Sequence, residues 1–422
     1  MTRAAHTSGA VEGGATASSP SSAASSRIPL CVPEIRGNEW TYIKECLDTN
    51  WVSAVGAYVD RFERAVAHAV GAKYGVATAS GTAALHVALL VAGVEPGDEV
   101  LVSTVTFIAP VNAIRYAGAW PVLIDAEPDH WQMDARAVRA YLENECVTRD
   151  GALYSRAGRR VRAILPVHIL GHPVDIDPII ELARAHGLRV IEDATESLGA
   201  RYRGRPVGHL GDIACFSFNG NKLITTGGGG MIVTDDEGMA KEAKYLTTQA
   251  KDDPIEFVHG AVGFNYRLTN IQAAMGVAQM EQLEPYLEAK RRIFARYDAA
   301  FARIPGLTPL AEATWAESAK WMYAVLVDEG RFGQSSRALL RYLAALGIET
   351  RPLWEPMHQS KPHESSAHTS YPVADRLHEQ AICLPCSVGL TAADQERVIA
   401  AVVAAHRAGA VDATPAASGA AV

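Results

Sequence analysis

The chain has 422 residues, a formal net charge of -8, 48% hydrophobic residues and 20% charged residues, a composition typical of a large globular protein. It contains no Lys/Arg-rich block, which argues against nucleic acid as a partner because phosphate binding needs concentrated positive charge. No apolar run reaches the roughly 18 residues that cross a bilayer, so no membrane association is expected.

Both ends of the sequence have the composition of disordered tails. Residues 1–27 are rich in Ala, Ser, Gly and Thr but lack the continuous apolar core of a signal peptide, and residues 408–422 are similar in composition. The six cysteines are scattered, which is typical of reduced thiols in a cytoplasmic protein. Cys383 and Cys386 form a lone CxxC. Without a second ligand pair or a helix-opening context, a structural role is favoured over zinc or redox chemistry.

Between the tails, short β-branched runs alternate with helical patterns, which predicts an α/β fold with a mostly parallel, buried sheet. The expected strands are 74–78, 99–103, 121–124, 162–167, 188–192, 212–218 and 230–234. The expected helices are 82–92, 108–117, 135–143, 178–186 and 236–247, followed by a longer helical stretch at 269–300 that breaks near Pro285. We expect a large domain over residues 28–285 and a smaller C-terminal α/β domain over residues 286–407.

The first candidate site is Ser80-Gly81-Thr82, between an expected strand and an expected helix. Gly81 permits close approach of the backbone, free amides at a helix N-terminus favour an anion, and Thr82 adds a hydroxyl. An ordinary helix cap explains the same residues. The segment lacks the Gly-Lys-Ser/Thr ending of a P-loop, so a nucleoside triphosphate is disfavoured.

Two adjacent acids, Glu192 and Asp193, end the next informative strand. Their side chains point to opposite faces of the sheet, so one of them can face a ligand. An acid in such a place can keep the pyridine nitrogen of pyridoxal phosphate (PLP) protonated, which makes the ring a better electron sink. Asp193 is the candidate for this role, although a helix-capping aspartate fits the local sequence equally well.

A lysine follows an aromatic-rich strand. The strand ends at Ser217, turn residues then present Lys222, and four glycines follow at 227–230. A partly desolvated lysine loses its proton more easily and can form a Schiff base, although a lone lysine after a strand is more often a solvated surface group. A phosphate cradle, an acid and a lysine thus occur in this order at successive strand ends of one sheet, where ligands collect.

These motifs together resemble the fold-type I PLP enzymes, specifically the nucleotide-sugar aminotransferases of the DegT/DnrJ/EryC1/StrS group. The resemblance covers residues from about Ile28 to Ala405 and implies a mostly parallel seven-stranded sheet sandwiched by helices. Within that group, the chain resembles the 4-aminotransferases that act on UDP-linked 4-keto-6-deoxy-N-acetylhexosamines of the bacillosamine and legionaminic acid type. The segments that carry this likeness are WVSAVGAYVDRFE (51–63), PVHILGHPVDID (166–177), FSFNGNK (216–222), ITTGGGGM (224–231), VGFNYRLTNIQAAMG (262–276) and a polar insertion around 144–160.

The resemblance implies a role for each matching position. Lys222 would be the catalytic residue, linked to PLP as a Schiff base, and Asp193 would face the pyridine nitrogen. The remaining cofactor contacts would be Glu196 near the phenolic oxygen, Phe107 stacked on the ring, and Gly81, Thr82 and Ser217 at the phosphate. Asn265 would reach the phosphate of the neighbouring subunit, which implies an obligate homodimer with shared active sites. L-glutamate would donate the amine and leave as 2-oxoglutarate in a ping-pong cycle.

Substrate contacts are expected from His168 and from the segment that holds Arg351 and His358. Arg351 can hold a diphosphate or a donor carboxylate through paired hydrogen bonds, or serve as a buried structural arginine. His168 and His172 have the spacing of a helical metal site, but the prolines and glycine around them argue against a helix, so no metal is expected. Trp321 is expected to pack in a strand core.

Three other functions remain open. A PLP-dependent sugar dehydratase of the same fold has histidine where the aminotransferases keep lysine, and Lys222 speaks against it. An aminotransferase acting at C3 of a dTDP-linked keto-sugar has the same machinery. A non-catalytic α/β nucleotide-binding module would not need Lys222 at all.

Overall fold

The computed structural model describes residues 27–253, 255–366 and 369–412. The expected N-terminal tail, apart from residue 27, lies outside the described residues. The expected start of the C-terminal tail at residue 408 is wrong, because the last helix, α13 (Ala392–Asp412), continues to residue 412. Its alanine-rich sequence favours helix over coil. None of the described helices is both long and apolar enough to cross a membrane.

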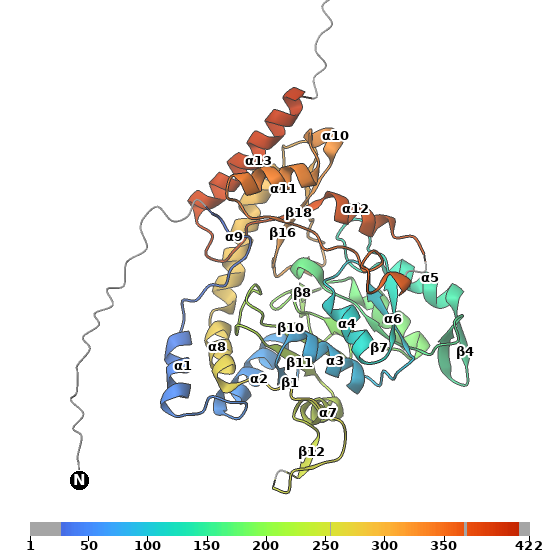
Figure 1. The fold of residues 1–422 in the computed structure, drawn as a ribbon. Helices are drawn as coiled ribbons and strands as arrows, with labels where there is room; N and C mark the ends of the chain where they lie inside the picture. The colour runs from blue at the N-terminus through green and yellow to red at the C-terminus, as the bar shows by residue number, and fades with distance from the viewer. Residues whose placement is uncertain (1–26, 254, 367–368, 413–422) are drawn as a thin grey trace, which may run out of the picture.

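A seven-stranded sheet of order β1-β11-β10-β7-β6-β2-β3 forms the centre of the fold (Figure 1). Its strands are β1 (Tyr74–Thr78), β2 (Glu99–Ser103), β3 (Trp120–Ile124), β6 (Val161–Leu165), β7 (Arg189–Asp193), β10 (Ile213–Ser217) and β11 (Gly230–Thr234). The pairs β10·β7, β7·β6, β6·β2 and β2·β3 are parallel, whereas β11 runs antiparallel to both β1 and β10. The prediction of a mostly parallel sheet is confirmed.

Helices cover both faces of this sheet, which is why its strands are buried. Alternate residues of each strand enter two separate cores, as in β2, where Val100 and Val102 pack in one and Leu101 in the other. The first core lies under α3 (Gly81–Val91), α4 (Ala109–Tyr116) and α7 (Glu237–Thr247). The second lies under α2 (Ala57–Val70), α5 (Ala135–Glu145), α6 (Ile176–His186) and α8 (Asn270–Met280).

The helix α9 (Leu283–Phe301) runs from the large sheet to a second sheet of order β14-β16-β18-β17 (Figure 1). The helical break expected near Pro285 lies at Glu281–Gln282. Pro285 sits in the first turn of α9, where its missing N–H would have had no intrahelical partner. The elements of this part are β14 (Leu307–Pro309), β16 (Tyr323–Val327), β17 (Arg351–Pro352), β18 (Ala381–Leu384), α10 (Glu329–Phe332), α11 (Ser336–Ala345) and α12 (Pro372–Gln380).

The first described residues pack against this second sheet and not against the large one. The Ile28 amide donates to the Gly347 carbonyl at 2.8 Å, and the Cys386 amide donates to the Leu30 carbonyl at 2.9 Å. The predicted division therefore assigns residues 28–30 to the large domain although their hydrogen bonds join them to the second sheet and its surroundings. The division into two domains at residue 285 stays a prediction.

The remaining elements are short or peripheral. The polar insertion forms a hairpin of β4 (Cys146–Arg149) and β5 (Ala152–Ser155), and a second hairpin of β12 (Lys251–Asp253) and β13 (Val258–His259) projects beyond α7 (Figure 1). The others are α1 (Glu39–Asp48), β8 (Arg201–Tyr202), β9 (Arg205–Pro206), β15 (Ala316–Glu317), η1 (Ile169–Gly171) and η2 (Glu364–Ser366).

Candidate active site

The carboxyl ends of neighbouring strands bring the predicted site residues to one edge of the sheet. Asp193 ends β7 and Ser217 ends β10, and these strands pair in parallel. Gly81 opens α3, which follows β1. A Cβ built on Gly81 would lie 2.8 Å from the Ser217 Cβ and 3.1 Å from its Oγ, so the two segments are in direct contact. The large sheet thus assembles residues that are more than a hundred positions apart.

The start of α3 has a helix cap and two amides without an acceptor among the described residues. Ser80 is the cap, because its Oγ accepts from the Ala83 amide at 3.1 Å. The amides of Gly81 and Thr82 donate to no acceptor among the described residues. Two free amides at a helix N-terminus beside the Ser217 hydroxyl fit a phosphate. The two explanations that the sequence left open therefore apply to different residues.

We expect Gly81→Ala to weaken PLP binding about tenfold or more, because the new methyl group would push Ser217 out of the cradle. The dissociation constant is measured by titrating apoprotein with PLP and following tryptophan fluorescence. Gly330→Ala is the control, since its Cβ would meet only an Asp328 side-chain oxygen at 3.5 Å. Equal PLP affinity in both variants and the wild type would exclude the cradle.

Lys222 points into the site and is partly desolvated, with 14% of its side chain exposed. Its Nζ lies 3.5 Å from the Glu196 Oε1 and 4.3 Å from the centre of the Trp321 ring. The structure thus brings Lys222 and Glu196 together, as the sequence predicted. The contact with Trp321 was not predicted.

Asp193 is buried, with 2% of its surface exposed. Burial raises the pKa of its carboxyl, while hydrogen bonds from Thr195 and the positive charge of Lys222 oppose that rise. Its Oδ1 accepts from the Thr195 amide at 3.0 Å, and within the described residues no cationic side chain forms an ion pair with it. A buried acid without a cationic partner fits a protonated ring nitrogen.

Glu196 is equally buried and its carboxylate is held at both oxygens. Oε2 accepts from the Leu170 amide at 2.8 Å, and Oε1 faces Lys222. Burial raises the pKa of Glu196 to about 7, and the charge of Lys222 limits the rise. Glu196 therefore changes protonation near neutral pH.

We expect the apoprotein to lose about 3 kcal/mol of unfolding free energy between pH 4.5 and pH 7 through Glu196 alone. The folded-state pKa of about 7 exceeds the reference value of 4.5, so the folded chain binds the proton more tightly and its advantage fades as pH rises through this window. Urea unfolding of apoprotein at pH 5 and pH 8 measures the change. Glu196→Gln should flatten the wild-type pH dependence, and an unchanged slope in this variant would contradict the assignment.

The model of the DegT/DnrJ/EryC1/StrS aminotransferase family matches residues 33–403. The chain belongs to this family. A GDP-perosamine synthase from Caulobacter vibrioides is 42% identical over 376 residues, which cover 89% of this chain and 97% of the relative. A putative pyridoxal phosphate-dependent aminotransferase, EpsN, from Bacillus subtilis is 38% identical, covering 88% of this chain and 94% of the relative.

Solved structures agree with this assignment. DesI in the presence of its TDP-sugar product superposes with a TM-score of 0.82 at 28% identity, covering 92% of this chain and 95% of that one. The protein is therefore a PLP-dependent nucleotide-sugar aminotransferase. The expected likeness to the UDP-specific subgroup is not supported, because the GDP-perosamine synthase is named for another nucleotide.

In this aminotransferase, His168 lies beneath the site and not in it. Its side chain is fully buried, its Nδ1 accepts from the Val174 amide at 2.9 Å, and its Nε2 lies 3.1 Å from Glu192. Since Nδ1 is an acceptor, the proton is on Nε2 and donates to the Glu192 carboxylate. Both ring nitrogens are thus engaged by protein groups, and the expected substrate contact of His168 stays a prediction. The His168 amide instead donates to the Asp193 carbonyl at 3.0 Å and helps to position that acid.

The two predicted residues of the smaller domain are also engaged by protein groups. His358 contacts the Thr104 Oγ1 through Nδ1 at 2.9 Å and the Asp375 Oδ1 through Nε2 at 2.8 Å, so it fastens the small domain to the end of β2. Both of its ring nitrogens contact protein groups, and its expected substrate contact stays a prediction. Arg351 is 61% exposed and pairs with Glu349 at 2.6 Å. Its substrate role stays a prediction.

Phe107 and Asn265 lie at the surface of the single chain. Phe107, expected to stack on the cofactor ring, is 55% exposed. Asn265 is exposed as well, and its backbone forms an isolated β-bridge with Thr248. Exposure leaves both side chains available to a cofactor or to a partner subunit.

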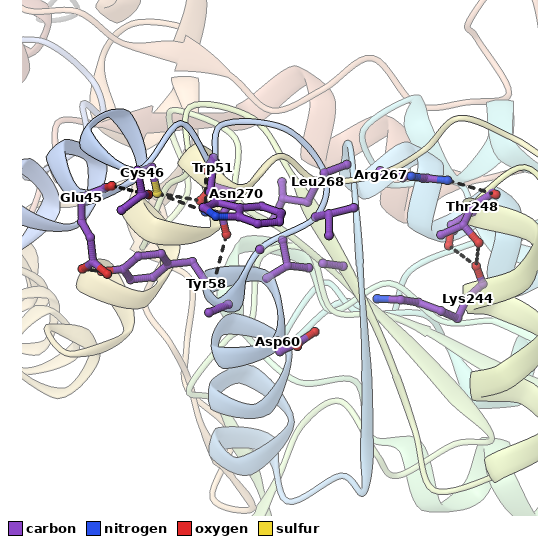
Figure 2. A pocket seen from close by; sticks show the side chains of 18 residues that line it. Glu45, Cys46, Trp51, Tyr58, Asp60, Lys244, Thr248, Arg267, Leu268 and Asn270 are labelled. Atoms are coloured by element: carbon purple, nitrogen blue, oxygen red, sulfur yellow. Dashed lines mark hydrogen bonds between the residues drawn. The ribbon is translucent and has the colours of Figure 1, made fainter. Parts of the chain in front are cut away.

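A cavity of about 660 Å³ lies between α1, α2 and the segment before α8 (Figure 2). Asn270 organises one side, since its amide nitrogen donates to the Trp51 carbonyl at 2.7 Å and its oxygen accepts from the Tyr58 amide at 3.1 Å. Arg267 lies on the other side and donates to the Thr248 carbonyl at 3.3 Å, while its Nε meets no acceptor among the described residues. None of the predicted catalytic residues lines this cavity.

Sequence reasoning missed two parts of the site. Trp321 packs in the first core, as expected, from a position just before β16, but its contact with Lys222 was missed. Glu192 was the unused member of an acid pair, and it proves to be fully buried against three backbone amides and His168. Alternation along the strand correctly places Glu192 on the face opposite to Asp193. It does not reveal the partner of Glu192, because His168 lies in another loop. No local signal pointed to either contact.

Proposed function

We propose that the protein transfers the amino group of L-glutamate to C4 of a nucleotide-linked 4-keto-6-deoxy sugar, giving the 4-amino sugar and 2-oxoglutarate. The observation that carries this proposal is the 42% identity to a GDP-perosamine synthase across nearly its whole length, because perosamine is a 4-amino sugar. The arrangement of Lys222, Asp193 and the cradle of Gly81 supports the chemistry.

Each side chain has a defined task in this proposal. Bound PLP supplies the electron sink that stabilises a carbanion next to nitrogen. Lys222 holds the cofactor at rest and, once its amine is free, takes the proton from the donor carbon that carries the amino group. Asp193 holds a proton on the ring nitrogen. Glu196 keeps the Lys222 amine oriented through the contact at 3.5 Å. Burial of the two acids excludes water from their charges.

The relatives favour a guanosine nucleotide, so a GDP-linked 4-keto-6-deoxyhexose is the first substrate that we propose. The second is UDP-2-acetamido-2,6-dideoxy-hexos-4-ulose, which the motifs at 216–222 and 166–177 suggested. Reaction at C3 of a dTDP-linked sugar and dehydration remain the alternatives. Lys222 argues against dehydration because that reaction is associated with histidine at the same position.

A substrate panel tests this proposal directly. Purified protein is incubated with PLP, L-glutamate and GDP-, UDP- or dTDP-linked 4-keto-6-deoxy sugars, and product masses and proton couplings are recorded. An amine at C4 with release of 2-oxoglutarate is the expected result. A 3-amino product would move the protein to the first alternative. Loss of water without 2-oxoglutarate would identify a dehydratase.

We further propose a homodimer in which Asn265 completes the partner's active site. The support is that large apolar side chains are exposed on the single chain around the cavity of Figure 2 and on the projecting hairpin β12–β13. They are Trp51, Val52, Val55, Ile255, Phe257 and Val262. Exposed apolar groups in this number are typical of a protein–protein interface.

Mixed dimers provide a quantitative test of shared sites. Lys222→Ala and Asn265→Ala subunits should each be poorly active alone, yet an equal mixture should regain about a quarter of the wild-type sites, because half of the dimers are mixed and one site in each is intact. Activity is measured after subunit exchange, and light scattering gives the mass. A mixture no more active than its parents would show that Asn265 serves its own subunit.

A cytoplasmic location is also part of the proposal. All six cysteines lie within the described residues and are free thiols, which supports a reducing compartment.

A further inference from the structure

The contact between Trp321 and Lys222 has no role in the proposed mechanism as described so far. Trp321 belongs to the segment that leads into β16, whereas Lys222 follows β10 of the large sheet. The indole is 4% exposed, and the Lys222 Nζ lies 4.3 Å from its ring centre. An ammonium at that distance from an indole face is attracted by the negative face of the ring.

The same indole also fixes the backbone that carries the lysine. Its Nε1–H donates to the Asn221 carbonyl at 2.8 Å, directly before Lys222 in the chain. The Trp321 indole therefore contacts both the turn before Lys222 and the ammonium group of Lys222. A residue that merely filled a core would need neither contact.

Trp321 is itself anchored at several points, so it can act as a fixed reference. Its carbonyl accepts from the buried Lys290 Nζ at 2.8 Å, and its ring stacks on Trp354 with 6.5 Å between centroids. A Cβ on Gly171 would lie 2.7 Å from the Trp321 amide nitrogen, so the η1 turn presses against this residue. The neighbouring Leu170 amide binds Glu196, the other group that contacts Lys222.

We propose that Trp321 is a positioning residue that holds the free Lys222 amine between its indole face and Glu196 during the half of the cycle in which the cofactor carries the amino group. The inference rests on the proposed role of Lys222. In that half-cycle the lysine has lost its covalent link, and an unheld chain of four methylene groups would sample many rotamers. A held amine is ready to move the proton at the substrate carbon.

The first test uses apoprotein, in which the Lys222 amine is free. Competitive labelling with acetic anhydride, read by peptide mass spectrometry, reports the reactivity of that amine relative to the exposed Lys241. We expect Trp321→Leu to raise Lys222 labelling about 2- to 30-fold, because the attraction to the ring face is lost. Trp321→Phe keeps a ring face and should stay close to the wild type. Equal labelling in all three proteins would overturn the inference.

The second test separates positioning from a role in substrate binding. For Trp321→Leu we expect kcat to fall about tenfold or more while KM for L-glutamate and for the keto-sugar stays within about twofold, and Trp321→Phe should recover most of the rate. A raised KM with unchanged kcat would make Trp321 part of the substrate wall instead. If the leucine variant does not fold, Trp321→Phe and Trp321→His carry the comparison. The phenylalanine variant should then keep a near-normal rate, while the histidine variant, with a smaller and more polar ring, should be slower.

The failures of the two proposals are distinguishable. Borohydride reduction of the holoprotein, followed by peptide mapping, shows which lysine carries PLP. A label on another lysine would defeat the assignment of Lys222. If PLP is found on Lys222 in all variants while acetylation of Lys222 and the kinetics are unchanged, only the proposed role of Trp321 is defeated.

Discussion

Lys222→Ala is expected to lower the rate of transamination about 10³-fold or more and to abolish the borohydride-stable link to PLP. The variant loses two functions at once, since the same amine anchors the cofactor and moves the proton at the donor carbon. The half-reaction with L-glutamate, followed by stopped-flow absorbance in the near ultraviolet and violet, isolates the proton transfer from sugar binding.

The folded state should survive this change, because Lys222 makes one long contact with Glu196 and one with Trp321. Lys241→Ala is the matched control, since Lys241 is 74% exposed on α7 and pairs only with Glu237 in the described part of the chain. Its activity should equal that of the wild type. A Lys222→Ala protein with full turnover would instead favour the non-catalytic module.

Asp193→Asn is expected to cost about 10²-fold or more in kcat. The asparagine keeps the shape and the Thr195 hydrogen bond but carries no negative charge, so a proton on the ring nitrogen is no longer favoured. Burial makes this charge more influential, since water does not screen it. The rate of the half-reaction with L-glutamate is the measurement.

Asp48→Asn is the control, because Asp48 is exposed at the end of α1 and forms an ion pair with Lys44. The unfolding free energy of the Asp193→Asn apoprotein should not decrease, because the variant removes a buried carboxyl whose pKa is raised by burial. Full activity of the Asp193→Asn enzyme would show that Asp193 does not face the ring nitrogen.

The sequence determined the large sheet and which candidate residues lie at the ends of its strands. Strand runs such as Tyr74–Thr78 and Gly230–Thr234 were predicted to the residue, because buried strands are short, apolar and bounded by turn residues. Asp193, Ser217 and Gly81 were recognised because each follows or precedes such a strand, and strand ends on one edge of a sheet must converge.

Only the tertiary structure decided what each side chain touches. His168 and His358 carry the chemistry of a substrate contact, but Glu192, Val174, Thr104 and Asp375 occupy their nitrogens. Trp321 looked like a core residue in its own segment and became a neighbour of Lys222 through packing between two sheets. Local sequence encodes backbone periodicity, whereas hydrogen-bond partners come from residues a hundred or more positions away, and no local pattern records them.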